Sequence, residues 1–362
     1  MAELEVALTQ DFGGFALNVA FEAPSGVTAL FGPSGAGKTT IVNAVAGLTV
    51  PQQGRVTARG TLLLDTAAGV NLPPRRRRVG YVFQEPRLFP HLSVRTNLLY
   101  GAHFAPKGAE GPSFDRVVEM LGIGALLTRR PGALSGGEKA RVSIGRALLA
   151  KPRLLLMDEP LAALDAARRE EILPFLEGLR DAGLPVLYVS HAIAEVARLA
   201  QTLVLIEGGR LRAAGPASEI LADPALAPLL GGGEAGTILA ARIAEIAPDG
   251  LIRLETGAGP VWVSEAPGGP GAALRLRIHA SDVILSRTRP EGLSALNILQ
   301  GTVTRIENEP NGRAFVQLKL GEEALLARLT QRSVAALGLA PGVAAHAILK
   351  TVAVSRDDLG GA

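Results

Sequence analysis

The segment FGPSGAGKTT, residues 31–40, constrains the fold of this chain more than any other stretch. It follows the apolar run VTAL and contains three glycines, one lysine and two threonines. Gly32, Gly37, Lys38 and Thr39 satisfy the spacing G-x-x-x-x-G-K-S/T, in which glycines let successive backbone N–H groups approach phosphate oxygens. The alternative is a glycine-rich turn with an accidental lysine. The apolar strand before the segment and the helical pattern after it favour a phosphate loop.

The residues after the loop are spaced as in a helix. Ile41, Val42, Val45 and Leu48 are expected to share its apolar face. A helix that begins at the loop presents free N–H groups and the positive end of its dipole to the phosphates. The predicted nucleotide-binding residues of the loop are Gly32, Pro33, Ser34, Gly35, Ala36, Gly37, Lys38, Thr39 and Thr40.

A second motif carries two carboxylates. The run RLLLMDEP places Asp158 and Glu159 at the end of an apolar strand, and buried parallel strands present functional residues at their carboxyl ends. With Lys38 on the β- and γ-phosphates and the Thr39 hydroxyl on Mg²⁺, Asp158 fits a ligand of the metal and its water. Glu159 fits the base that activates the attacking water. The alternative is that the two acids only cap the strand. Together with the phosphate loop they predict hydrolysis of a nucleoside triphosphate.

The pattern of apolar runs divides the chain into two predicted domains. Over residues 1–230, short branched runs alternate with helical patterns, which predicts an α/β domain of the P-loop NTPase class with a largely parallel sheet. The glycine-rich segment 231–236 is interpreted as a linker. Closely spaced strand patterns over residues 237–362 predict a small all-β domain with one short helix at RSVAALGL.

The charge balance does not point to nucleic acid. Lys plus Arg number 37 and Asp plus Glu 34, so the net charge is only +3 over 362 residues. The run of four arginines at 75–78 lacks interleaved aromatic residues, so we interpret it as a solvated loop. The chain has no cysteine, no signal-peptide pattern and no run of about 18 apolar residues, so we expect a reducing compartment and no membrane span.

The segment LSGGEKARVSIGRALL, residues 134–149, contains a second candidate anion site. Ser135 and Glu138 have the spacing of a capping box, so the segment can be simply a well-capped helix. Gly136 and Gly137 would each cost a helical turn about 1 kcal/mol relative to alanine, and such glycines are useful where backbone meets a ligand closely. One γ-phosphate does not need two such sites from one chain, so we expect a second subunit facing the first.

With these motifs the chain resembles the ATP-binding-cassette family. The segment LSGGE resembles the family signature LSGGQ, with Glu138 at the glutamine position. Gln84 in YVFQEP resembles the residue of the glutamine loop, and Asp165 in LAALD resembles the acid of the D-loop. His191 in YVSHAIAEV resembles the switch histidine that contacts the γ-phosphate.

The resemblance implies how two chains share ATP. In the family, a head-to-tail homodimer would hold each ATP between Gly32–Thr39 of one chain and Ser135–Gly137 of the other, with Asp165 near the shared seam. The resemblance also implies that ATP closes the dimer and that hydrolysis lets it open. Phe12 in DFGGF resembles the aromatic residue that stacks on adenine, and Phe15 is the competing choice.

The cofactors implied by the resemblance are ATP and Mg²⁺. Glu159, His191 and Gln84 would form the catalytic group. Gln84 would also join Thr39 and Asp158 around the metal.

A membrane permease is implied as the main partner. The segment 85–101 resembles the face of a helical subdomain, about residues 85–150, that touches the permease in this family. The chain would then be peripheral at the cytoplasmic face of the inner membrane, and an extracytoplasmic substrate-binding protein would act indirectly. Four apolar residues are either a docking patch or the core of the subdomain: Leu88, Phe89, Leu92 and Val94.

The C-terminal sequence resembles the carboxyl-terminal domain of molybdate-importer ATPases, an OB-like β-barrel of the TOBE/Mop type, over about residues 275–355. This resemblance implies import of molybdate or tungstate and a regulatory oxyanion. Hydrogen-bond donors suited to a tetrahedral oxyanion are Ser294, Asn297, Thr330, Ser333 and Lys350. The alternative is that these residues only form turns and caps.

The substrate has alternatives at this stage. Related oxyanion-binding proteins usually show SARN where this chain has SALN, so Leu296 replaces the expected arginine, and Arg332 is the only nearby substitute that we consider. Importer ATPases for sulfate and maltose carry barrels at the same place, so import of sulfate or thiosulfate, ferric iron or sugar is the alternative. A soluble cassette protein without a transport role is disfavoured, because the chain has one phosphate loop and no heptad run.

Overall fold

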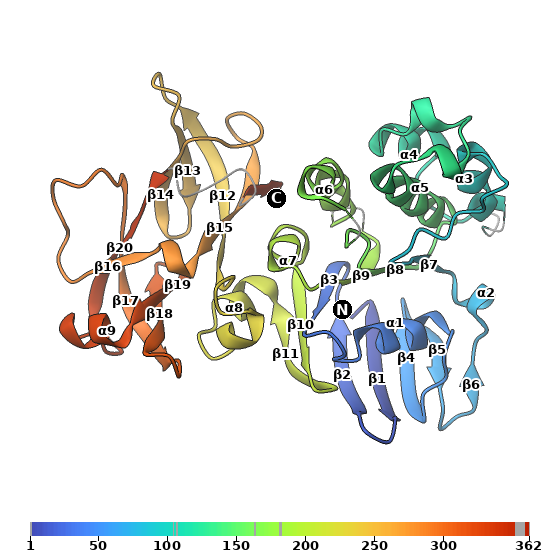
Figure 1. Cartoon of the computed structure of the whole chain (residues 1–362), viewed down its shortest axis with the longest axis horizontal. Coiled ribbons are helices and arrows are strands. Elements are labelled where there is room, and N and C mark those ends of the chain that lie inside the picture. The colour runs from blue at the N-terminus through green and yellow to red at the C-terminus, as the bar shows by residue number, and fades with distance from the viewer. Residues whose placement is uncertain are drawn as a thin grey trace. The chain divides into compact units, whose positions relative to one another are not determined.

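The computed structural model describes residues 2–103, 105, 108–162, 164–180, 183–351 and 359–361 (Figure 1). It comprises two compact units. The first unit contains Met1–His191 and Leu199–Gly215, and the second contains Ala192–Arg198 and Pro216–Ala362. Each unit is described by itself below.

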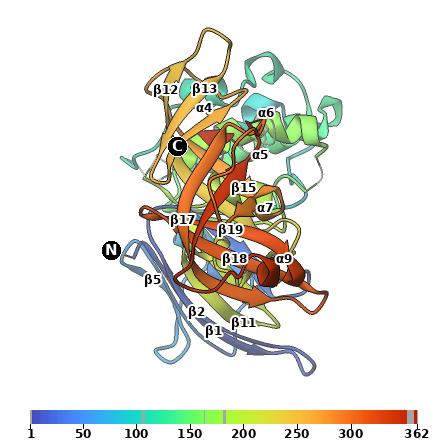
Figure 2. The ribbon, with the colours of Figure 1, turned by 90° about the vertical axis from the view of Figure 1, so that its left-hand side faces the viewer.

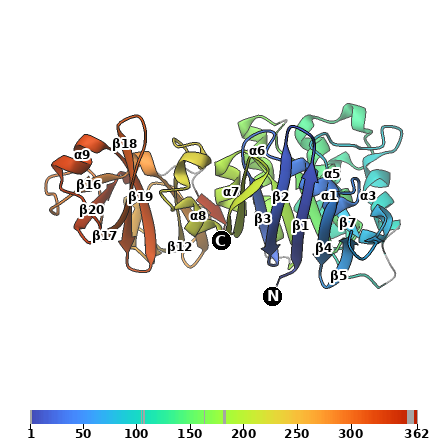
Figure 3. The ribbon, with the colours of Figure 1, turned by 90° about the horizontal axis from the view of Figure 1, so that it is seen from below.

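An 11-stranded sheet forms the framework of the first unit, with the order β6-β5-β4-β1-β2-β11-β10-β3-β9-β8-β7 in the described residues. Figure 3 shows β1, β2 and β4 side by side in this sheet. The strands are β1 Leu4–Asp11, β2 Ala16–Ala23, β3 Gly26–Phe31, β4 Gln53–Ala58, β5 Thr61–Asp65, β6 Val70–Asn71, β7 Val79–Val82, β8 Leu154–Asp158, β9 Pro185–Val189, β10 Thr202–Glu207 and β11 Arg210–Pro216.

The part of this sheet that carries the predicted motifs is parallel. β3 pairs in parallel with β10 on one side and β9 on the other, and β8 lies in parallel between β9 and β7. Every residue of β3, β8 and β9 is buried, as expected for strands covered on both faces. This arrangement confirms the predicted α/β class with a largely parallel central sheet.

Figure 1 labels the α-helices of both units. The α-helices are α1 Lys38–Ala46, α2 Pro74–Arg77, α3 Val94–His103, α4 Phe114–Met120, α5 Gly136–Leu149, α6 Ala166–Arg180, α7 Ile193–Leu199, α8 Ala217–Leu221 and α9 Gln331–Ala336. The 3₁₀ turns are η1 Gly124–Leu126, η2 Pro131–Ala133, η3 Ala227–Leu230 and η4 Ala280–Asp282. Among the helices within the described ranges, none has both the length and the apolar character required to cross a bilayer.

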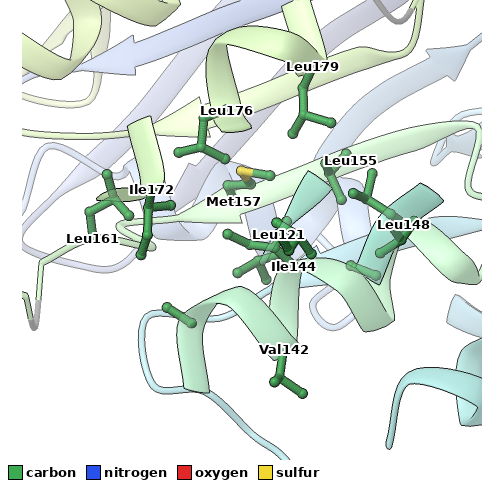
Figure 4. Close-up of a cluster of buried hydrophobic side chains, with 14 of the residues drawn as sticks. Leu121, Val142, Ile144, Leu148, Leu155, Met157, Leu161, Ile172, Leu176 and Leu179 are labelled. Atoms are coloured by element: carbon green, nitrogen blue, oxygen red, sulfur yellow. The ribbon is translucent and has the colours of Figure 1, made fainter. Parts of the chain in front are cut away.

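Helices α3, α4 and α5 form a helical region between β7 and β8. Its core, drawn in Figure 4, joins residues such as Leu121, Ile144 and Leu148 to Met157 of β8 and Ile172 of α6. The predicted helical subdomain therefore has a shared hydrophobic core with the strand that ends in Asp158.

The four apolar residues of segment 85–101 divide between core and surface. Val94 is fully buried and Leu88 packs against the same core, so these two are core residues. Phe89 instead packs against the exposed Tyr100, with ring centroids 4.4 Å apart. Leu92 is half-buried.

The helix after the phosphate loop is shorter than the sequence pattern predicts. α1 ends at Ala46 because Gly47 adopts a left-handed conformation, φ 78°, and its N–H bonds back to the helix. Ile41, Val42 and Val45 are buried as predicted. Leu48 lies beyond the helix end and is 52% exposed, so its predicted place on the apolar face is wrong.

The second unit is β-rich, which confirms the predicted all-β domain (Figure 2). Its described strands form two curled antiparallel sheets of five strands each, β14-β13-β12-β15-β21 and β16-β20-β17-β18-β19, around one apolar core. The predicted short helix is α9. The strands are β12 Gly236–Ile246, β13 Ile252–Thr256, β14 Gly259–Val263, β15 Ala273–His279, β16 Ile284–Ser286, β17 Asn297–Asn308, β18 Arg313–Leu320, β19 Glu323–Thr330, β20 Ala344–Leu349 and β21 Leu359–Gly361.

The second unit begins earlier in the sequence than the glycine-rich segment 231–236. Residues after Pro216 pack on its strands: Gln317 donates to the carbonyl of Ala222, and Arg305 forms an ion pair with Asp223. These contacts join α8 and the following turn to the β unit, although the sequence assigns residues 216–230 to the first domain.

Candidate functional site

Four parallel strands bring the predicted motifs to one edge of the central sheet. β3 leads into the phosphate loop, β8 ends at Asp158, β9 is followed by Ser190 and His191, and β7 is followed closely by Gln84. Since the strands are parallel neighbours, their carboxyl ends meet at the same edge. The register of the sheet therefore assembles residues that lie far apart in the sequence.

The phosphate loop depends on two glycines for different reasons. A side chain at Gly32 would place its Cβ 2.1 Å from the carbonyl oxygen of Ile206 in β10, so only glycine allows this close approach of two backbones. Gly37 precedes the first residue of α1 with φ 98°, in the left-handed region that favours glycine. The fold requires both the close backbone approach at Gly32 and the left-handed conformation at Gly37. Together they direct the N-terminus of α1 toward the loop.

The side chain of Lys38, the first residue of α1, reaches back to the phosphate loop. Its Nζ donates to the carbonyl oxygens of Gly32 and Pro33 at 2.7 and 2.9 Å. Burial lowers the pKa of the Lys38 ammonium, and the nearby carboxylates of Glu159 and Asp158 oppose that shift. Lys38 therefore places a buried cation beside carbonyls that phosphate oxygens can replace as its partners.

Thr39 and Asp158 form the pair predicted to hold a metal ion. The Thr39 hydroxyl donates to Oδ1 of Asp158 at 3.4 Å. Burial raises the pKa of the Asp158 carboxyl, while the Thr39 hydrogen bond favours the ionised form. A hydroxyl and a carboxylate side by side are the hard oxygen donors that Mg²⁺ prefers, so the residues fit this ion.

Tyr81 is a neighbour of the site that the sequence did not reveal. Its hydroxyl lies 3.4 Å from Oδ2 of Asp158 and 3.1 Å from Oδ1 of Asn43 in α1. Burial raises the pKa of the Tyr81 hydroxyl. The tyrosine thus links β7, β8 and α1 behind the predicted metal ligands.

Glu159 is flanked by both of its predicted catalytic partners. Its Oε2 accepts a hydrogen bond from Nε2 of Gln84 at 3.4 Å and lies 3.4 Å from Nδ1 of His191. Glu159 has φ 47°, a left-handed conformation that is uncommon for a side chain of its size, while its N–H bonds to the carbonyl of Val189 at 3.1 Å. The backbone at this position turns the carboxylate toward the strand edge where the other motifs lie.

A cavity of about 390 Å³ opens beside the loop and is bordered by both candidate aromatic residues. Phe12 is 55% exposed, and its ring lies 6.1 Å from that of Phe15. Phe15 packs closer to the protein, because a side chain at Gly37 would meet its ring at 3.3 Å. Phe12 therefore offers a free face for a planar base, and Phe15 supports the loop. The cavity also includes Glu159 and Ser34, Gly35, Gly37, Lys38, Thr39 and Thr40.

The segment around Ser135 forms the predicted capping box. The Ser135 hydroxyl accepts from the N–H of Glu138 at 3.3 Å, and Glu138 accepts from the N–H of Ser135 at 2.7 Å. That backbone hydrogen bond lowers the pKa of the Glu138 carboxyl. A Cβ at Gly136 or Gly137 would meet only ordinary contacts at 3.5 Å. The fold of this chain thus leaves room for side chains at both glycines.

Asp165 caps the next helix instead of meeting the loop in the described structure. Its Oδ1 accepts from the N–H of Arg168 at 3.0 Å in the first turn of α6. The carboxylate also pairs with the Arg168 side chain and is 59% exposed.

One arginine of the run at 75–78 contradicts the interpretation of a solvated loop. Arg75 and Arg76 are exposed, but Arg77 is only 1% exposed. Burial lowers the pKa of its guanidinium. Helix α2, which begins after Pro73, places this guanidinium against the last carbonyls of α1, so the charge run contains a structural residue that composition cannot single out.

The candidate oxyanion residues fall into two groups separated by the 12-residue strand β17. Asn297 begins this strand opposite Leu349, next to Lys350. Thr330 lies opposite Arg313, beyond the other end of β17. The structure therefore does not bring the five candidates together within one chain.

Several of these candidates have structural roles. The side-chain amide of Asn297 is buried, accepting from the N–H of Trp262 and donating to its carbonyl at 2.7 and 2.8 Å. Thr330 caps α9 and lies 2.8 Å from the hydroxyl of Ser333. Ser294 and Lys350 are exposed, as are Leu296 and Arg332.

Comparison with known proteins agrees with this geometry. The ABC transporter family model matches residues 17–162, and the TOBE domain model matches residues 293–355. A molybdenum import ATP-binding protein ModC from Rhizobium etli is 50% identical over 355 residues, which cover 97% of this chain and 99% of the relative. ModC 1 from Azotobacter vinelandii is 49% identical over 348 residues, covering 95% and 96%.

A solved structure shares the fold of the first unit. MJ1267, an ATP-binding cassette of an ABC transporter, aligns with a TM-score of 0.54 and 26% identity, covering 63% of this chain and 98% of the other. The strand-edge site, the two family matches and the near full-length relatives lead to one assignment. The chain belongs to the ABC transporter family, as an ATP-binding protein with a C-terminal TOBE domain.

Proposed function

We propose that this chain is the ATP-hydrolysing subunit of an ABC importer that drives uptake of molybdate or tungstate. The observation that carries the catalytic part is Glu159, which lies between Gln84 and His191 at the strand edge of the phosphate loop. The assignment of the substrate rests on relatives named molybdenum import ATP-binding proteins, which are 50% identical to this chain over 97% of its length.

In this proposal each polar residue has one task. The N–H groups at the start of α1 and the Lys38 ammonium bind the β- and γ-phosphates of ATP. Thr39 and Asp158, with Gln84, hold Mg²⁺, which when bound neutralises charge on the phosphates. Glu159 takes the proton of the attacking water, and His191 orients Glu159 and the γ-phosphate.

The same proposal places two chains around each ATP. Ser135 presents a hydroxyl at the N-terminus of α5, and Gly136 and Gly137 leave the backbone bare although the chain itself has room for a Cβ at each position. The free space at both positions supports the proposal that the two glycines let the backbone approach a phosphate of ATP bound to the partner chain. Asp165, exposed at the start of α6, would lie at the same seam.

A membrane permease dimer is the proposed mechanical partner, with the ATPase dimer at the cytoplasmic face of the membrane. A partly exposed aromatic group of the helical region supports this docking: Phe89 packs on Tyr100, and the guanidinium carbon of Arg146 lies 5.5 Å from the centroid of the Phe89 ring. Tyr100 is 45% exposed and Leu99 is 37% exposed. Aromatic residues and arginine are enriched where protein interfaces are strongest.

Regulatory binding of molybdate or tungstate by the TOBE domain remains a separate proposal. Because the five candidate donors do not meet in one chain, a site built from them needs groups from a second copy. Calorimetric titration of the full-length dimer with molybdate, tungstate and sulfate tests this. Heat from molybdate and tungstate alone supports it, and no heat from any anion removes it.

Transport in proteoliposomes tests the main proposal. The purified chain, assembled with its permease, should support ATP-dependent uptake of labelled molybdate that unlabelled tungstate inhibits. Uptake inhibited by sulfate, iron or sugar but not by tungstate would move the chain to another importer class. A Lys38→Ala variant is the control, because loss of the buried cation should abolish ATP binding and uptake together.

A further inference from the structure

Arg77 is a buried cation whose partners are all uncharged. Its Nη1 donates to the carbonyls of Ala44 and Val45 at 2.7 and 2.9 Å. Its Nε donates to the carbonyl of Leu72, and Nη2 donates to Oδ1 of Asn71, both at 2.7 Å. A fully buried arginine is rare unless its donors are satisfied, and here the fork is held by four short hydrogen bonds.

Two of these acceptors belong to the last turn of α1. A helix leaves its last four carbonyls without partners, and its C-terminal end carries partial negative charge. Gly47 satisfies part of this end through its own N–H, which bonds to the carbonyl of Ala44 at 3.2 Å. Arg77 supplies the remaining donors for Ala44 and Val45 and brings a positive charge to the negative end of the dipole.

The position of Arg77 in the sequence connects this helix end to a second part of the site. Arg77 is the last residue of α2, and β7 begins two residues later at Val79. α1 carries Lys38 and Thr39 at its other end, while β7 leads to Gln84. Arg77 therefore joins, at their distal ends, the two elements that present phosphate-binding and catalytic residues.

We infer that Arg77 is a positioning residue of the nucleotide site, which fixes the phosphate-loop helix against β7 so that Lys38, Thr39 and Gln84 keep their mutual geometry. This inference rests on the proposed ATPase function. It assigns a role to the arginine run, and it predicts that a change far from the phosphates alters ATP binding through the helix.

Gly47 provides a way to move the guanidinium without removing it. A Cβ at this position would lie 2.5 Å from Nε and 2.8 Å from Cζ of Arg77. The guanidinium of Arg77 cannot shift without breaking some of its four hydrogen bonds. Gly47→Ala should therefore force it away from the carbonyls. The strain of alanine at φ 78° is present in any background, whereas the clash exists only when Arg77 is present.

A double-mutant cycle on the full-length protein tests the inference. The dissociation constant of ATP is measured by calorimetry for the wild type, Arg77→Met, Gly47→Ala and the double variant, below their unfolding temperatures. Each single variant should bind ATP about tenfold more weakly, as expected for misplaced binding groups. Gly47→Ala should then add little to Arg77→Met, because their shared contact is already lost. Additive losses would contradict the inference.

Controls separate positioning from general stability. Arg76→Met removes an exposed charge from the same helix and should leave ATP affinity unchanged. Leu176→Ala removes a buried side chain from the core that α6 shares with the helical region, which is separate from the core that contains α1. It should lower the melting temperature without weakening ATP binding. Equal loss of affinity in Leu176→Ala and Arg77→Met would mean that Arg77 is merely structural.

Milder variants keep the test valid if Arg77→Met does not fold. Asn71→Ala removes a single acceptor and should give a smaller loss of ATP affinity in the same direction, and Arg77→Lys should restore part of the affinity by keeping a cation at the helix end. Unchanged affinity in Asn71→Ala and Gly47→Ala would overturn the inference. Lys38→Ala distinguishes failure of the proposed function from failure of this inference. If Lys38→Ala binds ATP normally, the proposed function fails. If the Arg77 variants bind ATP normally but Lys38→Ala does not, this inference alone fails.

Discussion

Nδ1 of His191 lies 3.4 Å from Oε2 of Glu159, although the two residues follow different strands of the central sheet. The same oxygen accepts a hydrogen bond from Gln84, which follows a third strand. The carboxylate therefore has two polar neighbours that can orient it toward a water molecule.

Replacing the carboxylate should stop turnover without preventing nucleotide binding. Glu159→Gln keeps the size of the side chain but removes the proposed base, so ATP hydrolysis should fall by about 100-fold or more. The variant should retain ATP and elute as a dimer in size-exclusion chromatography with ATP, because the proposed mechanism places closure before hydrolysis. Turnover close to that of the wild type would show that another group activates water.

His191→Ala tests whether the histidine acts on the same step. The loss of its contact with Glu159 should lower kcat by about tenfold to 100-fold while the dissociation constant of ATP changes little. A parallel loss of ATP affinity without a change in kcat would instead assign His191 to binding.

The two aromatic residues beside the cavity should differ in effect. Phe12→Ala removes the exposed ring and should weaken ATP binding by about 1–3 kcal/mol, the usual contribution of base stacking on an aromatic ring. Phe12→Tyr keeps the ring and serves as its control. Phe15→Ala should mainly lower thermal stability, because Phe15 packs beside Gly37. Fluorescence titration with ATP and with triphosphate alone separates the base contribution, and equal losses for both ligands would contradict stacking.

Ser135 and Ser113 form a matched pair for testing the shared ATP site. Both serines cap an α-helix and accept a hydrogen bond from the N–H three residues later. Ser135→Ala and Ser113→Ala should each cost about 1 kcal/mol of stability. Only Ser135→Ala should weaken ATP-dependent dimer formation, measured by analytical ultracentrifugation with hydrolysis blocked by Glu159→Gln. Equal dimerisation in the two variants would exclude the Ser135 hydroxyl from the shared site.

The capping box predicts a pH dependence of stability. The backbone hydrogen bond from Ser135 lowers the pKa of Glu138 in the folded chain, so the unfolded chain binds more protons at mildly acidic pH. The stabilising contribution is therefore complete above the unfolded pKa of about 4.3 and is lost as the pH falls through the folded value. Urea midpoints of the wild type and Glu138→Gln should converge on acidification. A constant difference from pH 7 to the acid limit would contradict this.

The sequence alone determined the features that depend on local spacing. The phosphate loop, the carboxylates after an apolar strand, the capping box and the change to closely spaced strands are each contained within a short stretch, so their physics can be read without a fold. Because parallel strands align their carboxyl ends, the sequence also predicted that Asp158 and the loop meet.

Only the tertiary structure decided the roles that depend on long-range neighbours. Arg77 looks like its exposed neighbours Arg75 and Arg76, and its burial follows from the end of α1 lying beside α2. From the sequence, Asn297 is a plausible anion ligand. In the structure, the backbone of Trp262 satisfies its side-chain amide. A side chain's partners, and hence its availability for ligands, are set by which distant backbone groups reach it, and one-dimensional spacing carries no information about that.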